Sequence, residues 1–298
     1  MNRAFTMTRR PRSLERFHGS TNIFGALSQM MATDDQRHLI FSGASGVGKT
    51  STALWIASAV LCKADNDRPC LECSSCLSVE RQSHQALHVI NCAQEGGKED
   101  IEFLLTEETR HEPVAARRHV IIFEEADQLS RPAQYALAVP LQETAGHRQF
   151  LFTCIDAEAL IRPVRDRCRH FRFELPTHLQ SMQYLREAAD EEEIQVNDAA
   201  LDLIAVFCRG YRSLLETLDA AASLACGSPI DPALLRRTVL RDRSAALLDY
   251  LAEVAGGNVE RQLAILDECS LTAPEKVRAI REMLAHLRIR YTGRRTPR

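Results

Sequence analysis

The chain has 298 residues, of which 45% are hydrophobic and 26% are charged, so it can bury a sizeable core and is neither disordered nor collagen-like. Its 37 basic and 40 acidic residues give a formal net charge of −3, which excludes a globally basic nucleic-acid binder and restricts any such contact to a local surface. At about 150 residues per domain, this length predicts two domains.

Apolar runs in the sequence are short, and none approaches the roughly 18 residues that a membrane-spanning helix needs. The Arg-rich N-terminal segment lacks the apolar core and small-residue cleavage site of a secretory signal. We therefore expect no membrane partner and a cytoplasmic location. In that setting the ten cysteines are expected to be reduced thiols or metal ligands.

In the first 176 residues, short apolar runs of strand length alternate with helical patterns. The predicted strands are 38–41, 87–91, 119–123, 149–155 and 171–176. The predicted helices are 51–62, 99–108 and 132–142, with Pro140 expected to kink the last one. Strands that are apolar on both faces predict a parallel sheet covered on both sides, which is an α/β fold.

After Pro176 only helical patterns remain, so we place a domain boundary there. The predicted helices are 179–193, 198–210, 212–226, 244–257 and 259 to about 290, and Gly210 and Gly227 are expected to end helices. The chain thus divides into an α/β domain over 1–176, a helical domain over 177–240 and a last helical part with a basic tail over 241–298.

Residues 43–50 read GASGVGKT, which satisfies the phosphate-loop pattern GxxxxGK[ST] between a predicted strand and a predicted helix. The glycines let backbone N–H groups surround a phosphate, Lys49 reaches the β- and γ-phosphates, and the Thr50 hydroxyl binds Mg²⁺. The predicted ATP and Mg²⁺ site comprises Gly43, Gly46, Val47, Gly48, Lys49, Thr50 and Ser51.

An acidic pair, Glu124 and Glu125, follows the predicted strand 119–123. Phosphate-loop enzymes use such a pair to hold the metal and to activate the attacking water. We predict that Glu125 polarises water and that Glu124 lies on the Mg²⁺ side. A merely solvated strand end is the alternative.

Four cysteines, Cys62, Cys70, Cys73 and Cys76, are spaced C-x7-C-x2-C-x2-C directly after the predicted phosphate-loop helix. Four closely spaced thiolates predict a closed tetrahedral Zn²⁺ site of a structural kind. Ordinary buried thiols are one alternative. An iron–sulfur cluster is another, although the trailing Cys-Pro of ferredoxins is absent from this motif.

Over roughly residues 10–270 the chain resembles the gamma/tau subunit of the bacterial DNA polymerase III clamp loader, an AAA+ ATPase. The resemblance rests on the entry segment 11–27, the phosphate loop, the four-cysteine insertion, the acidic pair followed by Leu-Ser, and DRCRHFRF at 166–173, which is similar to the family's SRC motif.

This resemblance implies an AAA+ parallel-sheet domain with an inserted zinc module (62–76), a helical lid and a short helical collar through which five subunits form an open ring. It implies delta-type and delta-prime-type subunits, a sliding clamp and primer–template DNA as partners. Arg167 matches the SRC arginine that acts on a neighbour's ATP, and Arg212 matches the lid arginine that contacts the subunit's own phosphate. The bland alternatives are a basic residue flanking a strand and a solvated helix charge.

Three features depart from the family pattern. Glu124 stands where the family has Asp, and Ile155, between Cys154 and Asp156, stands where the family has a polar residue that senses the γ-phosphate. Thr153 or Asp156 takes that place if the strand register is shifted. The region after about 242 is similar to only the first part of the family's collar, without the tau-specific extension.

The sequence therefore favours an ATPase that loads a sliding clamp in DNA replication as part of a hetero-oligomer. A scaffold subunit that binds nucleotide and zinc with weak or no hydrolysis is the second hypothesis, favoured by Ile155 and Glu124. An AAA+ protein of a mobile element or defence system is the third.

Overall fold

The computed structural model describes residues 17–19, 21–33, 35, 37–64, 68–114, 116–142 and 146–239, which divide into two compact units between Pro176 and Thr177. The helices expected at 244–257 and from 259 onward lie outside these residues. Within the described part of the chain, no helix combines the length and apolar character needed to cross a membrane.

A five-stranded sheet forms the centre of the first unit. Its strands are β1 (His38–Ser42), β2 (Leu87–Asn91), β3 (His119–Glu124), β4 (Arg148–Cys154) and β5 (Cys168–Arg172). They lie in the order β2-β3-β4-β1-β5, and every neighbouring pair is parallel. The predicted parallel sheet is confirmed.

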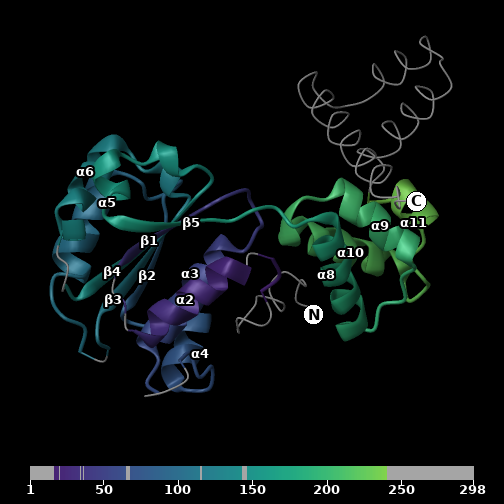
Figure 1. The fold of residues 1–298 in the computed structure, drawn as a ribbon, viewed down its shortest axis with the longest axis horizontal. Helices are drawn as coiled ribbons and strands as arrows, with labels where there is room; N and C mark the ends of the chain where they lie inside the picture. The colour runs from purple at the N-terminus through teal and green to yellow at the C-terminus, as the bar shows by residue number, and fades with distance from the viewer. Residues whose placement is uncertain are drawn as a thin grey trace, which may run out of the picture. The chain divides into compact units, whose positions relative to one another are not determined.

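Helices cover both faces of this sheet (Figure 1). The α-helices are α2 (Thr21–Ala32), α3 (Lys49–Leu61), α4 (Ser74–Glu80), α5 (Lys98–Phe103), α6 (Arg131–Ala138) and α7 (Arg162–Arg165). Shorter turns are the π-helical η2 (Leu104–Glu108) and the 3₁₀ turns η3 (Ala126–Gln128), η4 (Pro140–Gln142) and η5 (Ala157–Ala159).

Alternation of side chains along the strands builds two cores. On β1, Leu39 and Phe41 face α2 and α3, whereas Ile40 faces α5 and α6. The same alternation places Phe150 and Phe152 of β4 in the second core, where they stack with Phe123 of β3. Both faces of the inner strands are therefore buried, as the continuous apolar runs predict.

The two edge strands are only partly buried, contrary to the expectation that every strand is apolar on both faces. Leu87 is the one buried residue of β2, and Phe171 is the one buried residue of β5. β5 also covers 168–172 instead of the predicted 171–176, because it pairs with β1 on one side only and tolerates polar residues such as Arg169 and His170.

Two predicted helices end earlier than their patterns indicate. The pattern over 99–108 is an α-helix only to Phe103 and then widens into the π-helical η2. The helix predicted over 132–142 stops at Ala138, and η4 begins at Pro140. Pro140 has no N–H for a helical hydrogen bond, so it ends this helix instead of kinking it.

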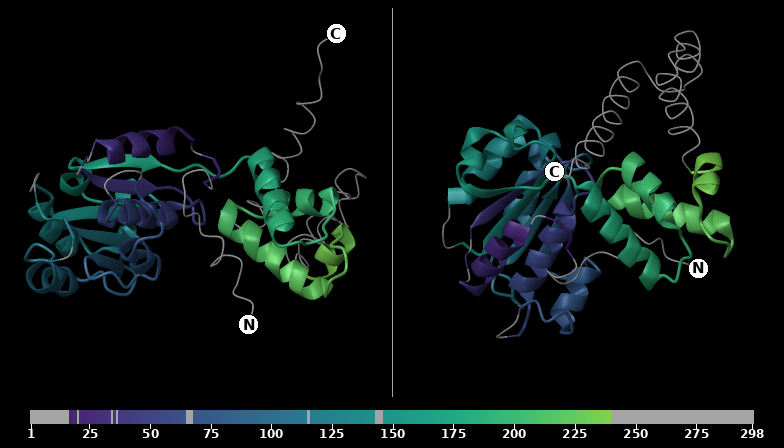
Figure 2. Two further views of the ribbon diagram at one scale, coloured as in Figure 1. Left: turned by 90° about the horizontal axis from the view of Figure 1, so that it is seen from below. Right: turned by 45° about the vertical axis from the view of Figure 1, so that its right-hand side comes forward.

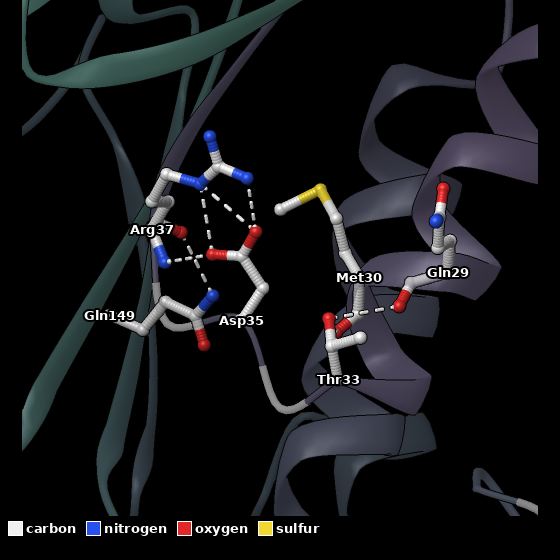
Figure 3. A network of polar contacts seen from close by, with 6 residues as sticks. All are labelled: Gln29, Met30, Thr33, Asp35, Arg37 and Gln149. Atoms are coloured by element: carbon white, nitrogen blue, oxygen red, sulfur yellow. Dashed lines mark hydrogen bonds and ion pairs between the residues drawn. The ribbon is translucent and has the colours of Figure 1, made fainter.

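Two groups of polar contacts lie between the end of α2 and the start of β1 (Figure 3). The Thr33 hydroxyl donates to the carbonyl oxygen of Gln29 at 3.0 Å, at the end of α2. The Asp35 carboxylate accepts from the backbone N–H and the guanidinium of Arg37, and this side-chain contact lowers the pKa of Asp35. The Gln149 amide donates to the Arg37 carbonyl at 3.0 Å, which joins the start of β1 to β4.

Four helices make up the described part of the second unit, drawn in green in Figure 2. They are α8 (His178–Glu191), α9 (Asp198–Phe207), α10 (Gly210–Ala225) and α11 (Pro232–Arg237). Thr177, Asn197 and Asp231 cap the N-termini of α8, α9 and α11 by accepting backbone N–H groups.

The core of the second unit is continuous between these helices and includes the fully buried Leu185, Ile204 and Leu218. The predicted helices 179–193, 198–210 and 212–226 correspond to α8, α9 and α10, whereas α11 is an addition. Gly210 does not end α9 as predicted. It is the first residue of α10, with φ 74°, and it turns the chain after two extended residues.

Candidate nucleotide site and metal centre

The predicted phosphate loop connects the end of β1 to the start of α3. Ser42 ends the strand and Lys49 begins the helix. Gly43, Gly46 and Gly48 have φ values of 142°, 76° and 99°, which residues with a side chain rarely adopt. The glycine spacing in the sequence therefore reflects three backbone turns that wrap the loop in front of the N-terminus of α3.

Lys49 lies over this loop. Its ammonium group donates to the carbonyl oxygens of Gly43 and Ala44, both at 2.7 Å. Val47 is buried, and the Thr52 hydroxyl donates to the Gly48 carbonyl at 2.9 Å, which anchors the loop on α3. Thr50 and Ser51 are half-buried in the first turn of α3.

Among the described residues, none accepts a hydrogen bond from the backbone N–H groups of Gly46, Val47 and Gly48. Uncommitted N–H groups at a helix N-terminus, next to one ammonium group, form a binding site for phosphate. The residues present therefore fit a nucleotide phosphate chain.

The acidic pair lies at the tip of β3. Glu124 is the last, half-buried residue of the strand, and the next residue, Glu125, is exposed and left-handed with φ 54°. A positive φ on a residue with a side chain is uncommon and is enriched at functional sites. The N–H of Gln128 donates to the Glu125 carbonyl at 2.8 Å and holds this turn.

The order of the strands brings these two segments together. β4 lies between β1 and β3, and in its register Ser42 is opposite Cys154 while Phe123 is opposite Phe152. The phosphate loop and the acidic pair therefore leave the same carboxyl edge of the sheet, on strands that flank β4. In open α/β sheets, ligands bind outside this edge.

Ile155 stands at the tip of β4 with 63% of its surface exposed. Thr153 is buried within the strand, and its hydroxyl lies 3.5 Å from the Phe123 carbonyl. The Asp156 carboxylate accepts the Glu158 N–H and caps η5. In this register, the side chain that projects from the strand tip is the apolar one of Ile155.

The two predicted arginines lie in different units. Arg167 follows α7 and directly precedes β5, where it is half-buried and donates to the Pro163 carbonyl. Arg212 is exposed on the first turn of α10 in the second unit.

One further acidic residue of this edge was not singled out from the sequence. Asp127 belongs to η3, and its carboxylate accepts the N–H of Ile155 at 3.2 Å. The only sequence signal is a third acidic residue close behind the pair, in the string EEAD. Such a signal is weak, because the partner of Asp127 is 28 residues away along the chain.

The four predicted cysteines form one cluster beside the first unit's α3. Cys62 caps the C-terminus of α3, Cys70 lies in the following loop, Cys73 caps α4 and Cys76 belongs to α4. Their sulfur atoms all lie within 4.8 Å of one another. None of the four forms a disulfide, and the sulfur atoms of Cys62 and Cys70 are 3.5 Å apart.

A tetrahedral Zn²⁺ with Zn–S bonds of about 2.3 Å separates its sulfur ligands by about 3.8 Å, and the sulfur atoms of the cluster, all within 4.8 Å of one another, are compatible with that spacing. A cluster of several irons holds its thiolates further apart, because each binds a different iron. The cysteine set therefore fits a single ion such as Zn²⁺ better than an iron–sulfur cluster.

Backbone N–H groups surround the sulfur atoms of this cluster. Those of Ala64 and Cys70 approach Cys62, that of Cys73 approaches Cys70, and that of Cys76 approaches Cys73, each at 3.4 Å. N–H groups, that of Glu72 foremost, lower the pKa of Cys70.

For Cys73, burial alone raises the pKa, but the N–H groups of Lys63 and Cys76 outweigh it and lower the pKa to about 6. Burial raises the pKa of Cys76. Thiolates held by N–H donors are the form that binds a metal.

Comparison with known proteins gives the family. The model of the family "DNA polymerase III, delta subunit" matches residues 19–177, more than half of the chain. The chain is 30% identical over 217 residues to DNA polymerase III subunit tau of Bacillus subtilis, covering 72% of this chain and 38% of that protein. It is 28% identical over 283 residues to subunit tau of Escherichia coli, covering 93% and 43%. The chain thus spans less than half the length of these two relatives.

The fold has solved counterparts. RuvB of Thermotoga maritima, a Holliday junction branch migration motor, superposes with a TM-score of 0.58 at 19% identity, covering 78% of this chain and 72% of that one. At this identity the likeness concerns the fold alone, which is a RuvB-like AAA+ fold. The family model, which matches more than half of the chain, shows that the chain belongs to the DNA polymerase III clamp-loader subunit family, and the tau subunits are among its similar relatives.

Proposed function

We propose that this chain is an ATP-binding and ATP-hydrolysing subunit of a clamp loader in DNA replication. The observation that carries the proposal is the placement of the phosphate loop and of the acidic pair on strands β1 and β3, at one edge of the sheet. Membership of the clamp-loader subunit family supports the larger role.

In this proposal the loop from Gly43 to Thr50 binds the phosphates of ATP. Lys49 already lies over the loop, and exchanging its carbonyl contacts for phosphate oxygens places its charge at the β- and γ-phosphates. Thr50 and Glu124 would hold Mg²⁺, which supplies charge neutralisation at the phosphates. Glu125, exposed in the left-handed turn directly after the strand, orients the attacking water.

Two arginines outside the phosphate loop and the acidic pair complete the proposed site. From the resemblance to the clamp-loader family, we propose that Arg167, half-buried directly before the edge strand β5, acts on the ATP of a neighbouring subunit. Arg212, on the first turn of α10, contacts the phosphate bound by its own subunit, and the helical unit serves as its lid. Delta-type subunits, a sliding clamp and primer–template DNA are the proposed partners.

Two variants separate binding from turnover. Lys49→Ala removes the charge at the phosphates and is expected to abolish tight ATP binding. Glu125→Gln is expected to keep binding and to stop hydrolysis of bound ATP. Equilibrium binding of ATP and single-turnover phosphate release measure the two steps, in the isolated chain and in the assembled complex with clamp and primed DNA.

Lys98→Ala is the control, since Lys98 is an exposed lysine of α5 that pairs with Glu102 at 3.1 Å. It should behave as the wild type in both assays. Unchanged ATP affinity in Lys49→Ala would refute the phosphate site. Clamp loading at the wild-type rate by a complex containing Glu125→Gln would refute the motor role of this subunit.

A second function, a scaffold subunit with weak hydrolysis, is favoured by the exposed apolar side chain of Ile155. It predicts that the complex assembles and loads clamps when this subunit cannot hydrolyse ATP. The clamp-loading assay with Glu125→Gln distinguishes the two.

A further inference from the structure

The tips of β3 and β4 are joined by one side chain. The Asp127 carboxylate, on the turn η3 after β3, accepts the backbone N–H of Ile155 at the end of β4, with 3.2 Å between oxygen and nitrogen. Asp127 is half-buried and lies two residues after Glu125. The turn that carries Glu125 is therefore tied to the neighbouring strand, and not only to its own.

The same peptide of β4 also contacts the phosphate loop. The N–H of Gly43 donates to the carbonyl oxygen of Ile155 at 3.2 Å and to that of Cys154 at 3.3 Å. The Gly43 carbonyl in turn accepts from the Lys49 ammonium at 2.7 Å. A continuous series of hydrogen bonds thus runs from Asp127 through the backbone of Ile155 and Gly43 to Lys49.

We propose that Asp127 is a positioning residue of the ATP site, which sets the turn carrying Glu125 against the phosphate loop through the backbone of Ile155. The inference rests on the proposed function, because it assigns Asp127 a part in the same ATP hydrolysis. Asp127 acts through Ile155 and touches no phosphate.

Electrostatics agree with this arrangement. Burial foremost, and then the negative charge of Asp127, raise the pKa of the Cys154 thiol to about 12, and the positive charge of Lys49 opposes this shift. Both charges therefore act on one buried group at the end of β4.

The proposal explains how an apolar residue is accommodated at the tip of β4. Ile155 takes part through its N–H and its carbonyl oxygen, so the position of the tip depends on Asp127 and not on the Ile155 side chain. Asp127→Asn keeps a side-chain oxygen that accepts this N–H, whereas Asp127→Ala does not. The required feature is the acceptor, and the charge is dispensable.

The test compares Asp127→Ala and Asp127→Asn in the full chain, isolated and in the assembled complex. We expect single-turnover hydrolysis of bound ATP to fall about tenfold in Asp127→Ala, as for the loss of one hydrogen bond, with ATP affinity changed less than about threefold. Asp127→Asn should restore hydrolysis to within about threefold of the wild type. Asp100→Ala is the matched control, because its carboxylate also accepts one backbone N–H, that of Gly97 at 3.1 Å.

Hydrogen exchange in the protein without nucleotide provides a second readout that does not need hydrolysis. Asp127→Ala should speed exchange in peptides covering 154–156 and 43–50, while Asp127→Asn and Asp100→Ala should not. If the wild type does not hydrolyse ATP, the proposed function is refuted. The hydrogen-exchange measurement still shows whether Asp127 holds the strand tip and the phosphate loop in place. Wild-type exchange in Asp127→Ala, or equal effects of Ala and Asn, would overturn the inference.

Discussion

Gly43 and Phe173 touch where the phosphate loop leaves the sheet. A Cβ atom on Gly43 would lie 2.3 Å from the carbonyl oxygen of Phe173, closer than real Cβ contacts come. The N–H of Phe173 donates to the Ser42 carbonyl at 2.7 Å, so the chain after β5 is fixed at this place and cannot move aside. Glycine is required here by space as well as by its φ of 142°.

We therefore expect Gly43→Ala to lower the free energy of unfolding by about 2–3 kcal/mol, because it adds backbone strain and a steric clash. Urea denaturation followed by circular dichroism measures this. Gly25→Ala is the control, since a Cβ on Gly25 meets nothing within 4 Å in helix α2, and it should stabilise by about 0.5–1 kcal/mol. Equal stability of Gly43→Ala and the wild type would contradict the close contact.

The cysteine cluster is expected to hold about one zinc per chain. Cys73→Ser should lose the metal and destabilise the segment from Cys62 to Cys76, while ATP binding persists because the phosphate loop lies outside that segment. Elemental analysis and ATP binding check both points. Cys226→Ser, which changes an exposed cysteine of the other unit, should keep the metal. Iron with visible absorbance would show that the zinc assignment is wrong.

Arg167→Ala is expected to leave ATP binding by the isolated chain unchanged and to slow hydrolysis only in the assembled complex. Where an arginine acts in trans on a nucleotide, it contributes about 10³–10⁵ in rate. Steady-state hydrolysis with and without the partner subunits measures the effect. Arg162→Ala, an exposed arginine on α7, is the control. If the isolated chain hydrolyses ATP as fast as the complex, the role in trans is refuted.

Ile155→Thr and Ile155→Asn are expected to speed hydrolysis. A polar group preorganised at the γ-phosphate is worth on the order of 3 kcal/mol, or about 10²-fold in rate, and the wild-type side chain cannot supply it. Single-turnover hydrolysis in the assembled complex measures the gain. Val139→Thr changes a similarly exposed apolar side chain directly after α6, and it should leave the rate of hydrolysis unchanged. Rapid ATP hydrolysis by the wild type that neither substitution increases would contradict the inference that Ile155 slows hydrolysis.

The first unit should lose stability in mild acid because of His38. Its imidazole is buried at the start of β1, Nδ1 accepts the Phe150 N–H at 3.2 Å, and burial lowers the pKa to about 4. The unfolded chain binds a proton near pH 6.5, whereas the folded chain binds it only near pH 4. Stability from this group is therefore complete above pH 6.5 and is lost as the pH falls towards 4.

The loss from His38 amounts to about 2–3 kcal/mol at pH 4.5. Burial also lowers the pKa of His88 and of His119, so both act in the same direction. Unfolding free energies at pH 7 and 4.5 measure the loss. His38→Asn retains a side-chain oxygen as acceptor but cannot titrate, so its stability should depend less on pH. An unchanged pH dependence would exclude His38 as the source.

The sequence by itself determined the features whose partners are close along the chain. The phosphate loop needs only three glycines and a lysine between a strand and a helix, and the cysteine cluster needs four thiols within 15 residues that two helix ends and a loop bring together. The parallel sheet followed from continuous apolar strands, because only strands covered on both faces avoid polar positions. These local patterns specify chemistry before any long-range contact forms.

Only the tertiary structure decided what lies next to each of these motifs. The order of strands puts β4 between the phosphate loop and the acidic pair, and this placement exposes Ile155 and gives it Asp127 as a partner. The bounds of β5 differ from the predicted ones because β5 lies at the edge of the sheet, and a strand with one neighbour need not be apolar. Gly43 meets Phe173 across 130 positions of sequence, because parallel pairing of β1 and β5 joins distant segments, and no periodicity within either segment records that pairing.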